Sequence, residues 1–243
     1  RYRSSAASDV YKRQILQMVQ HTTMQTMCYL LGQEQRKRQQ RLETIYFIVG
    51  KYNLREIFDM NIFYLHENPE VCAKMHCDKH VVKMIIEYAQ MLSTAHRMLD
   101  GVAVKKPSQS GKTMVTHWDL FEGCDDLEAE MTYYKAVHFN HPCTVWTRTS
   151  KQNYKYLYDL FCALCDEYTF RYKRIHETDM KLRSALWVFP NNIPDIGFTE
   201  PPQAMPDYCK VVGNPIQAYH NYYINEKSRF AKWKLREQPR WYK

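Results

Sequence analysis

The fold is decided by residues 78–99, which read DKHVVKMIIEYAQMLSTAHRML. Apolar residues recur there at steps of three and four, which is the period of an amphipathic α-helix. These apolar positions are Val81, Ile85, Ala89, Leu92, Ala95 and Leu99. We therefore expect a long helix from Asp78 to Leu99 with one stripe buried in a core.

A second face of the same helix is polar. Its members share the helical period and form a continuous line, namely His80, Lys83, Glu87, Gln90, Thr94 and Arg97. Every amphipathic helix has a solvated face, and this is the favoured interpretation of the line. The alternative is that the line forms one wall of a functional site.

Other helical patterns lie downstream. A second long helix is predicted from about Ser150, with an apolar stripe made of Tyr154, Leu157, Phe161, Leu164 and Tyr168. A shorter helix is expected from Asp125 and ends before Asn140-His141-Pro142. Asn214 and Pro215 are a good N-cap and first helical residue, so a final helix is expected to run to about Leu235.

Two stretches lack a helical pattern. Residues 100–117 are interpreted as a loop or insertion. From Phe189 to Pro215, counting Pro215 itself, there are six prolines and two glycines, which are typical of a long ordered coil on the surface. The predicted fold class is mainly α, a compact single-domain helical bundle with a long Pro-rich surface coil.

The positive charge of the chain is concentrated at its ends. The net charge is +8, yet residues 60–225 carry 17 Lys and Arg against 19 acidic residues. Residues 226–243 carry seven basic residues against two acidic ones. A clustered excess of this kind is a nucleic-acid footprint, whereas a diffuse one is not.

The N-terminal part is expected to be foreign to the fold. Residues 1–14 resemble a translated sequencing adapter, and residues 1–59 are predicted to be a non-native or disordered extension. The alternative is a genuine basic helical extension that aids nucleic-acid binding. Met60 opens the apolar segment Met60-Asn61-Ile62-Phe63-Tyr64-Leu65, which is strand-like or buried, so the functional domain is predicted to span residues 60–243.

The cysteine pattern and the apolar runs limit the classes of protein to which the chain can belong. Eight irregularly spaced cysteines favour reduced thiols over a disulfide framework. Zinc needs four ligands, and neither Cys162-x-x-Cys165 nor the His76, Cys77 and His80 group has a second matching pair. We predict no metal, no cofactor and no membrane partner.

Cations and aromatic rings are interleaved near the C-terminus. The cations, which can neutralise phosphates, are Lys227, Arg229, Lys232, Lys234, Arg236, Arg240 and Lys243. The rings, which can stack on exposed bases, are Phe230, Trp233, Trp241 and Tyr242. The alternative, stronger for Phe230 and Trp233 than for the terminal rings, is that they pack into the core.

Three patches of residues 60–243 resemble a known family. The ending Pro239-Arg240-Trp241-Tyr242-Lys243 is similar to the Pro-x-Trp-Tyr-Lys ending of the pyrimidine-dimer DNA glycosylases, the endonuclease V enzymes of ultraviolet repair. Asp78-x-His80 followed by Glu87 resembles their first helix. The stretch from His141 to Arg171 resembles their central helix, and the chain from Met60 also resembles uncharacterised phage and marine proteins that open MNIFYL.

The resemblance implies a DNA N-glycosylase with AP-lyase activity on damaged or modified pyrimidines. It implies that the α-amine of Met60 is the nucleophile and that Glu87 is the catalytic carboxylate. His80 and His141 would line the site, and Lys83 is the alternative nucleophile. An α-amine titrates near pH 8, so a useful fraction is unprotonated at neutral pH.

Double-stranded DNA is the expected partner of a monomeric protein. The residues expected to contact it are Lys79, Arg229, Lys232, Arg236, Arg240, Trp241, Tyr242 and Lys243. The expected location is the cytoplasm or nucleoid, including the cytoplasm of an infected host cell. Two alternatives remain open: a non-catalytic nucleic-acid-binding protein on the same scaffold, and an enzyme that processes nucleotides or modified bases.

Overall fold

The helix expected from Asp78 is the central element of the structure, and it runs as α3 from Asp78 to Asp100. The structure is a computed structural model that describes residues 60–108, 110–124 and 127–242. The expectations for residues 1–59 lie outside the described residues.

The described residues contain eight α-helices and one small antiparallel sheet, so the mainly α fold class is confirmed. The elements are α2 (Pro69–Met75), α3 (Asp78–Asp100), β1 (Val102–Pro107), β2 (Met114–Asp119), α4 (Leu120–Cys124), α5 (Leu127–Thr132), α6 (Pro142–Thr149), α7 (Lys151–Tyr172), α8 (Glu177–Leu182) and α9 (Pro215–Tyr222). Short 3₁₀ turns occupy Ala185–Trp187 and Asp207–Cys209, and a π-turn occupies Tyr223–Lys227.

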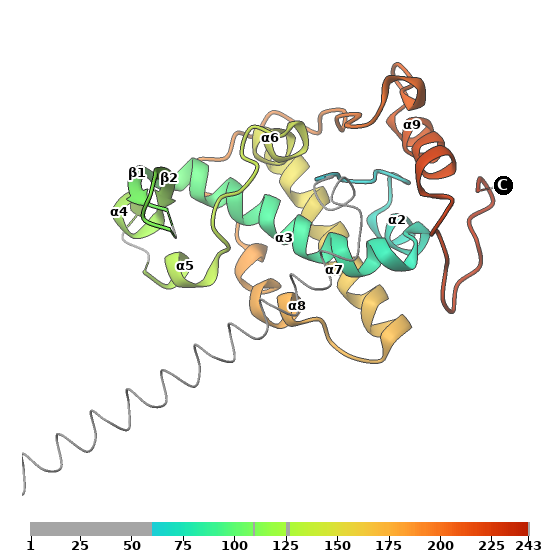
Figure 1. Cartoon of the computed structure of the whole chain (residues 1–243), viewed down its shortest axis with the longest axis horizontal. Helices are drawn as coiled ribbons and strands as arrows, with labels where there is room; N and C mark the ends of the chain where they lie inside the picture. Colours follow the sequence, from blue (N-terminus) through green and yellow to red (C-terminus); the bar gives the residue numbers. More distant parts are fainter. Residues whose placement is uncertain (1–59, 109, 125–126, 243) are drawn as a thin grey trace, which may run out of the picture. The chain divides into compact units, whose positions relative to one another are not determined.

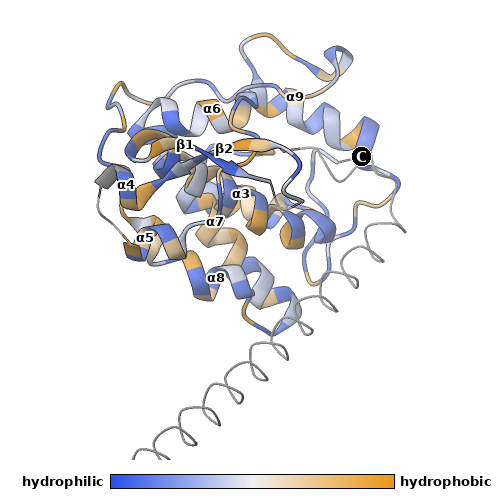
Figure 2. Cartoon of the chain, turned by 60° about the vertical axis from the view of Figure 1, so that its left-hand side comes forward, coloured by the Kyte–Doolittle hydropathy of each residue, from blue (hydrophilic) through white to orange (hydrophobic). Residues whose placement is uncertain are grey.

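The core lies where α3 passes α7. Helix α3 also packs against α6, and α2 packs against α7. In Figure 2 hydrophobic and hydrophilic residues alternate along α3, as expected of an amphipathic helix. The predicted apolar stripe of α7 is confirmed, because Tyr154, Leu157, Phe161 and Leu164 are all 0% exposed and Tyr168 is 4% exposed.

The expectation of a loop at residues 100–117 is wrong, because two strands pair there. Strands β1 and β2 form a hairpin in which Val102 pairs with Asp119 and Pro107 pairs with Met114. The β-branched residues of both strands favour this structure, and Gly111 supplies the positive φ of the turn. Gly101 lets the chain leave α3 tightly, since a Cβ there would lie 2.5 Å from the carbonyl oxygen of Arg97. Figure 1 shows the hairpin at the opposite end of α3 from α9 and the C-terminal segment.

Two helix boundaries also differ from expectation. The helix expected from Asp125 is shorter than predicted and ends at Thr132. The final helix begins as predicted at Asn214, whose side chain caps Gln217, but it ends at Tyr222 and continues only as the π-turn to Lys227. Backbone groups beyond this point bond to Asp78 instead of extending the helix, because the Asp78 amide donates to the Lys232 carbonyl and the Lys234 amide donates to the Asp78 carboxylate.

Candidate functional site

The segment that starts at Met60 lies inside the fold. Met60 is 3% exposed, Ile62 and Leu65 are 0% exposed, and the segment forms buried coil and no strand. The Tyr88 hydroxyl of α3 donates to the Ile62 carbonyl oxygen. This contact places the segment beside α3, one residue from Glu87.

Asn61 connects this segment to α6 and α9. Its Oδ1 accepts from the Tyr219 hydroxyl at 2.5 Å and from the Ile62 amide at 2.9 Å, and the Cys143 thiol lies 4.0 Å away. Cys143 in turn donates its backbone amide to Nδ1 of His141 at 3.2 Å, so His141 is the N-cap of α6. The start of α6 that His141 caps therefore lies next to the Met60 segment, and Cys143 is the residue that contacts Asn61.

His80 is held in an aromatic environment near the start of α3. It is 5% exposed, its ring stacks on Phe63 with 4.1 Å between centroids, and its Nδ1 lies 2.5 Å from the Tyr223 hydroxyl. Phe63 adopts a φ of 47°, which is rare for a bulky residue. Such backbone strain persists only where the surroundings enforce it, and it clusters at functional sites.

The surroundings of His80 keep its imidazole neutral. Burial lowers the pKa of His80 well below its ordinary value of 6.5, and nearby His76 and the lysines at 227, 83 and 79 lower it further. A neutral imidazole can accept a proton during a reaction, whereas an imidazolium cannot. A base with a pKa so far below neutral takes up a proton poorly at neutral pH, because general-base catalysis favours a pKa close to the working pH. His80 is therefore suited to lining the site and holding the Tyr223 hydroxyl, and not to serving as the base.

Glu87 lies two helical turns beyond His80 on α3. Glu87 is 8% exposed, and its Oε1 lies 2.9 Å from Nζ of Lys83.

The solvated-face interpretation of the polar line is wrong for most of its residues, because Thr94 and Arg97 are also buried, at 0% and 3% exposure, while Lys83 and Gln90 are half-buried. Phe63 of the Met60 segment covers His80. Thr94 bonds to the Val137 carbonyl and Arg97 bonds to Glu130 of α5, so the far end of the line is covered by the chain between α5 and α6.

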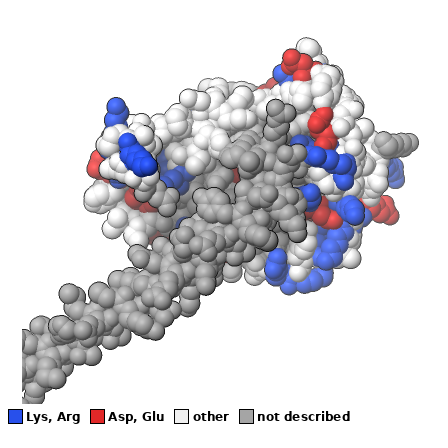
Figure 3. Space-filling model, viewed as in Figure 1, with Lys and Arg blue, Asp and Glu red and all other residues white. Residues whose placement is uncertain are grey.

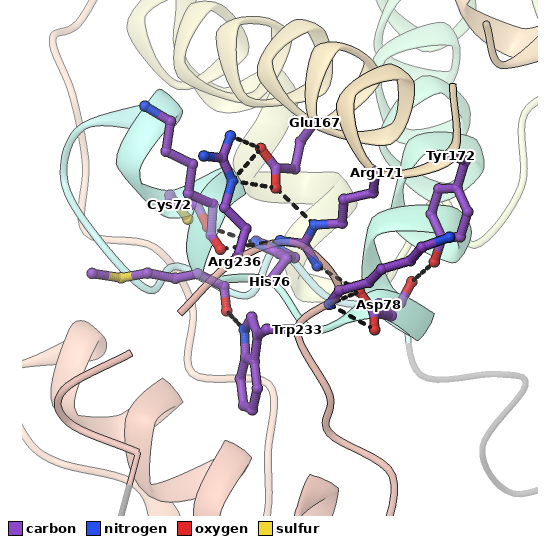
Figure 4. A network of polar contacts seen from close by, with 11 residues as sticks. Cys72, His76, Asp78, Glu167, Arg171, Tyr172, Trp233 and Arg236 are labelled. Carbon is purple, nitrogen blue, oxygen red and sulfur yellow. Dashed lines mark hydrogen bonds and ion pairs between the residues drawn. The ribbon is translucent and has the colours of Figure 1, made fainter. Parts of the chain in front are cut away.

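A buried ion-pair network holds the C-terminal segment against α2, α3 and α7 (Figure 4). Arg171 is 1% exposed; its Nε donates to Glu167 at 2.7 Å and its Nη1 donates to Asp78 at 2.8 Å. Arg236 approaches Glu167 from the other side, with Nη2 donating at 2.8 Å. Burial raises the pKa of Glu167, but hydrogen bonds from Arg236 and Arg171 outweigh it and the net pKa is lowered. Arg236 is thus engaged inside the protein.

Cations and rings alternate on the surface above this network. Lys79 lies over Phe230 at 4.5 Å, Lys173 over Phe170 at 4.9 Å and Lys234 over Tyr172 at 5.3 Å. Figure 3 shows Lys and Arg side chains gathered over the end of α7 and α2. We call this the basic–aromatic surface, and it comprises Lys79, Phe170, Tyr172, Lys173, Phe230, Lys232 and Lys234.

The residues expected to contact DNA fall into two groups. Four are exposed, namely Lys79, Arg229, Lys232 and Arg240. Two rings instead pack against the core, because Trp241 stacks on His220 with 3.9 Å between centroids and Tyr242 lies against Trp233 at 4.7 Å. We no longer expect these two rings to stack on bases. The side chain of Lys243 lies outside the described residues.

The sequence prediction missed the contribution of α7 to this surface. The run Phe170-Arg171-Tyr172-Lys173-Arg174 mixes rings and cations just as the C-terminal segment does, and this signal could have identified it. Phe170 is 39% exposed although it is a large ring on a helix. Lys173 ends α7 in the left-handed conformation and turns the chain, so the cation stands at the corner of the surface.

Neither a protein-family model, nor a curated protein, nor a solved structure matches this chain. Among the described residues no three His, Cys, Asp or Glu side chains are placed to hold a metal ion. The same part of the chain contains no helix with the length and apolar character needed to cross a membrane.

Proposed function

We propose that the protein is a DNA-binding repair-type enzyme, a DNA N-glycosylase with AP-lyase activity on damaged or modified pyrimidines. One observation carries the proposal: His80, on the same polar face of α3 as Glu87, stacks on Phe63 of the Met60 segment and contacts Phe230 of the basic–aromatic surface. The surface would hold DNA, and the polar face would perform the chemistry.

The proposed DNA contacts follow from charge and stacking. The exposed ammonium groups of Lys79, Lys173, Lys232 and Lys234 can each neutralise a phosphate and release counterions. Phe170 is 39% exposed and carries Arg236 and Lys173 over its ring at 4.0 and 4.9 Å, so it offers the exposed part of its ring to an unstacked base. Binding of this kind is strongly salt-dependent.

The proposed chemistry uses the α-amine of a chain that begins at Met60. The amine nitrogen bonds to the sugar C1′ while the glycosidic bond breaks, and the base departs with that electron pair and takes up a proton. Opening of the sugar ring then gives a Schiff base. Glu87 removes a C2′ proton, and the 3′ phosphate leaves as the elimination product.

Lys83 is a weaker candidate for the nucleophile. Its ammonium group already contacts Oε1 of Glu87 at 2.9 Å, so it would have to transfer a proton to that carboxylate before attacking. A useful fraction of a Met60 α-amine is already unprotonated at neutral pH and needs no such step.

Borohydride trapping on abasic and dimer-containing duplexes tests the proposal. We expect a covalent protein–DNA adduct from a chain that begins at Met60. Adding Gly-Ser before Met60 moves the amine by roughly 7 Å and should abolish the adduct. Glu87→Gln should reduce its yield at least about 100-fold, the usual contribution of a general acid or base.

Glu128→Gln is the charge-matched control, since Glu128 lies on α5 and is exposed. It should trap as well as the unaltered protein. An adduct that persists in the Gly-Ser extended chain would rule out the Met60 amine, and no adduct on either substrate would rule out the lyase chemistry.

A second candidate is a non-catalytic nucleic-acid-binding protein on the same scaffold. The burial of Met60 favours it, because a residue 3% exposed must move before its nitrogen reaches a sugar. This function predicts salt-dependent DNA binding without strand cleavage.

A further inference from the structure

A concave site lies on the flank of α3, between the end of α7 and α8. It has a volume of about 610 Å³, which lies within the range of small-ligand pockets. Its lining includes Ile86, Tyr134, Tyr168, Arg174, Ile175 and Lys181. None of these residues belongs to the chemistry proposed above.

Two tyrosines with attached cations form the inner part of this pocket. The Lys181 ammonium lies 5.2 Å from the centre of the Tyr134 ring, and the Arg174 guanidinium donates to the Tyr168 hydroxyl at 2.7 Å. The Tyr134 hydroxyl is 3.0 Å from the hydroxyl of Thr178. The rings are thus fixed by contacts, and both cationic side chains are exposed at the rim.

The remaining lining is aliphatic. Ile86 is 41% exposed and Ile175 is 57% exposed, although both are large apolar residues. A flat aromatic ligand would cover such surface while an anionic group attached to it met the rim. Glu177 also lines the pocket, so the two cations exceed the carboxylates of the lining by one.

The position of the pocket connects it with the proposed DNA site. Ile86 directly precedes Glu87 on α3, and Arg174 directly follows Lys173 of the basic–aromatic surface.

We propose that this pocket binds one nucleoside 5′-monophosphate group, with the base against Tyr134 and the isoleucines and the phosphate on Arg174 and Lys181. The group is either a free nucleotide or an unpaired nucleotide of a bound strand. The inference rests on the nucleic-acid part of the proposed function and does not depend on the lyase chemistry.

Titration of the full chain with AMP, with the heat of binding measured by calorimetry, tests the proposal. We expect saturable binding of AMP and weaker binding of adenosine and of inorganic phosphate, because each lacks one half of the ligand. Lys181→Ala should weaken AMP binding about tenfold through loss of one charge-assisted contact, and Lys181→Arg should restore most of it. Ile86→Trp should block the pocket sterically.

Lys155→Ala is the matched control, since Lys155 is an exposed lysine on α7 paired with Asp159. It should leave AMP binding unchanged, and thermal unfolding of each variant checks its folding. A 5′-phosphorylated trinucleotide that binds more tightly than AMP identifies the strand as the source, and equal affinity identifies the free nucleotide.

AMP binding that does not saturate, or that Lys181→Ala leaves unchanged, would overturn the pocket assignment. Duplex binding and borohydride trapping are measured on the same variants. Lys181→Ala should retain duplex binding and adduct formation. Failure of the pocket proposal and failure of the proposed function therefore give different results.

Discussion

Two buried polar side chains, His76 and Arg171, are closely matched by hydrogen-bond partners. His76 is 0% exposed; its Nδ1 donates to the Cys72 carbonyl at 2.8 Å, and its Nε2 lies 3.1 Å from the Tyr88 hydroxyl. Arg171 satisfies its donors on Glu167, Asp78 and a carbonyl of α2. Such groups are costly to bury without partners, so each residue tolerates little substitution.

The protein should lose stability in mild acid. Burial lowers the pKa of His76 from 6.5 to about 4, so between these values the unfolded chain binds a proton that the folded one does not. The free energy of unfolding therefore falls as the pH drops from 6.5 towards 4, by about 3 kcal/mol for this residue. Denaturant unfolding at several pH values measures the effect.

His76→Gln should be less stable at pH 7 but should have a shallower pH dependence in this window. His117→Gln, on the exposed hairpin, is the control and should keep the unaltered slope. An equal slope in His76→Gln would show that the acid sensitivity has another origin.

Among the secondary-structure elements, the ends of the helices determine where the charged side chains of the basic–aromatic surface lie. Helix α7 ends at Tyr172, and Lys173 follows in the left-handed conformation with its ammonium over Phe170. The C-terminal segment lies beside this end because Asp78 accepts the Lys234 amide. The basic–aromatic surface is therefore assembled from the end of α7, the start of α3 and the last residues.

Removing two cations from this surface should weaken DNA binding and its salt dependence together. The double variant is Lys173→Asn/Lys232→Ala. Asparagine is chosen at residue 173 because it tolerates the left-handed backbone there. The slope of log affinity against log salt should become less negative by about 2, since each phosphate contact contributes about 0.9. Fluorescence anisotropy with a duplex at several salt concentrations measures it.

Lys155→Ala/Lys210→Ala removes the same charge from elsewhere on the surface and should change the slope far less. If both double variants had the same slope, binding would depend on net charge and not on this surface.

At the scale of the whole molecule, the two ends of the region 60–243 meet. Asn61 bonds to Tyr219 of α9, and its amide donates to the Ala204 carbonyl of the Pro-rich coil at 2.8 Å. His220 lies 3.0 Å from the Leu65 carbonyl and stacks on Trp241. The fold is closed by these contacts between residues far apart in the sequence.

Asn61→Ala should destabilise the whole fold. The change leaves the buried Ile62 amide without its acceptor and removes the donor to the Ala204 carbonyl, while the Tyr219 hydroxyl keeps the Pro202 carbonyl at 2.8 Å. We expect a loss of about 2–3 kcal/mol in the free energy of unfolding. Urea unfolding measures it. Asn191→Ala, at an exposed asparagine, should change the value by less than about 0.5 kcal/mol, and comparable losses in both variants would contradict this role of Asn61.

Much of the fold could be predicted from local patterns. The apolar stripes of α3 and α7 and the caps at Ser150 and Asn214 follow from residues within one or two turns of each other. The hairpin was missed because its Gly, Lys and Pro residues are also typical of loops. The end of the last helix was missed because Asp78 competes for the backbone of residues 232 and 234.

The sequence by itself determined the mainly helical class, the placement of the two long helices and the excess of charge at the C-terminus. Only the tertiary structure decided that the polar line of α3 is largely buried, that Trp241 packs on His220 and that Arg236 pairs with Glu167. The physical reason is the separation along the sequence of the residues whose contacts decide each feature. A helix forms from neighbours along the chain, but burial of a side chain depends on segments that lie from 21 to 143 residues away in the sequence.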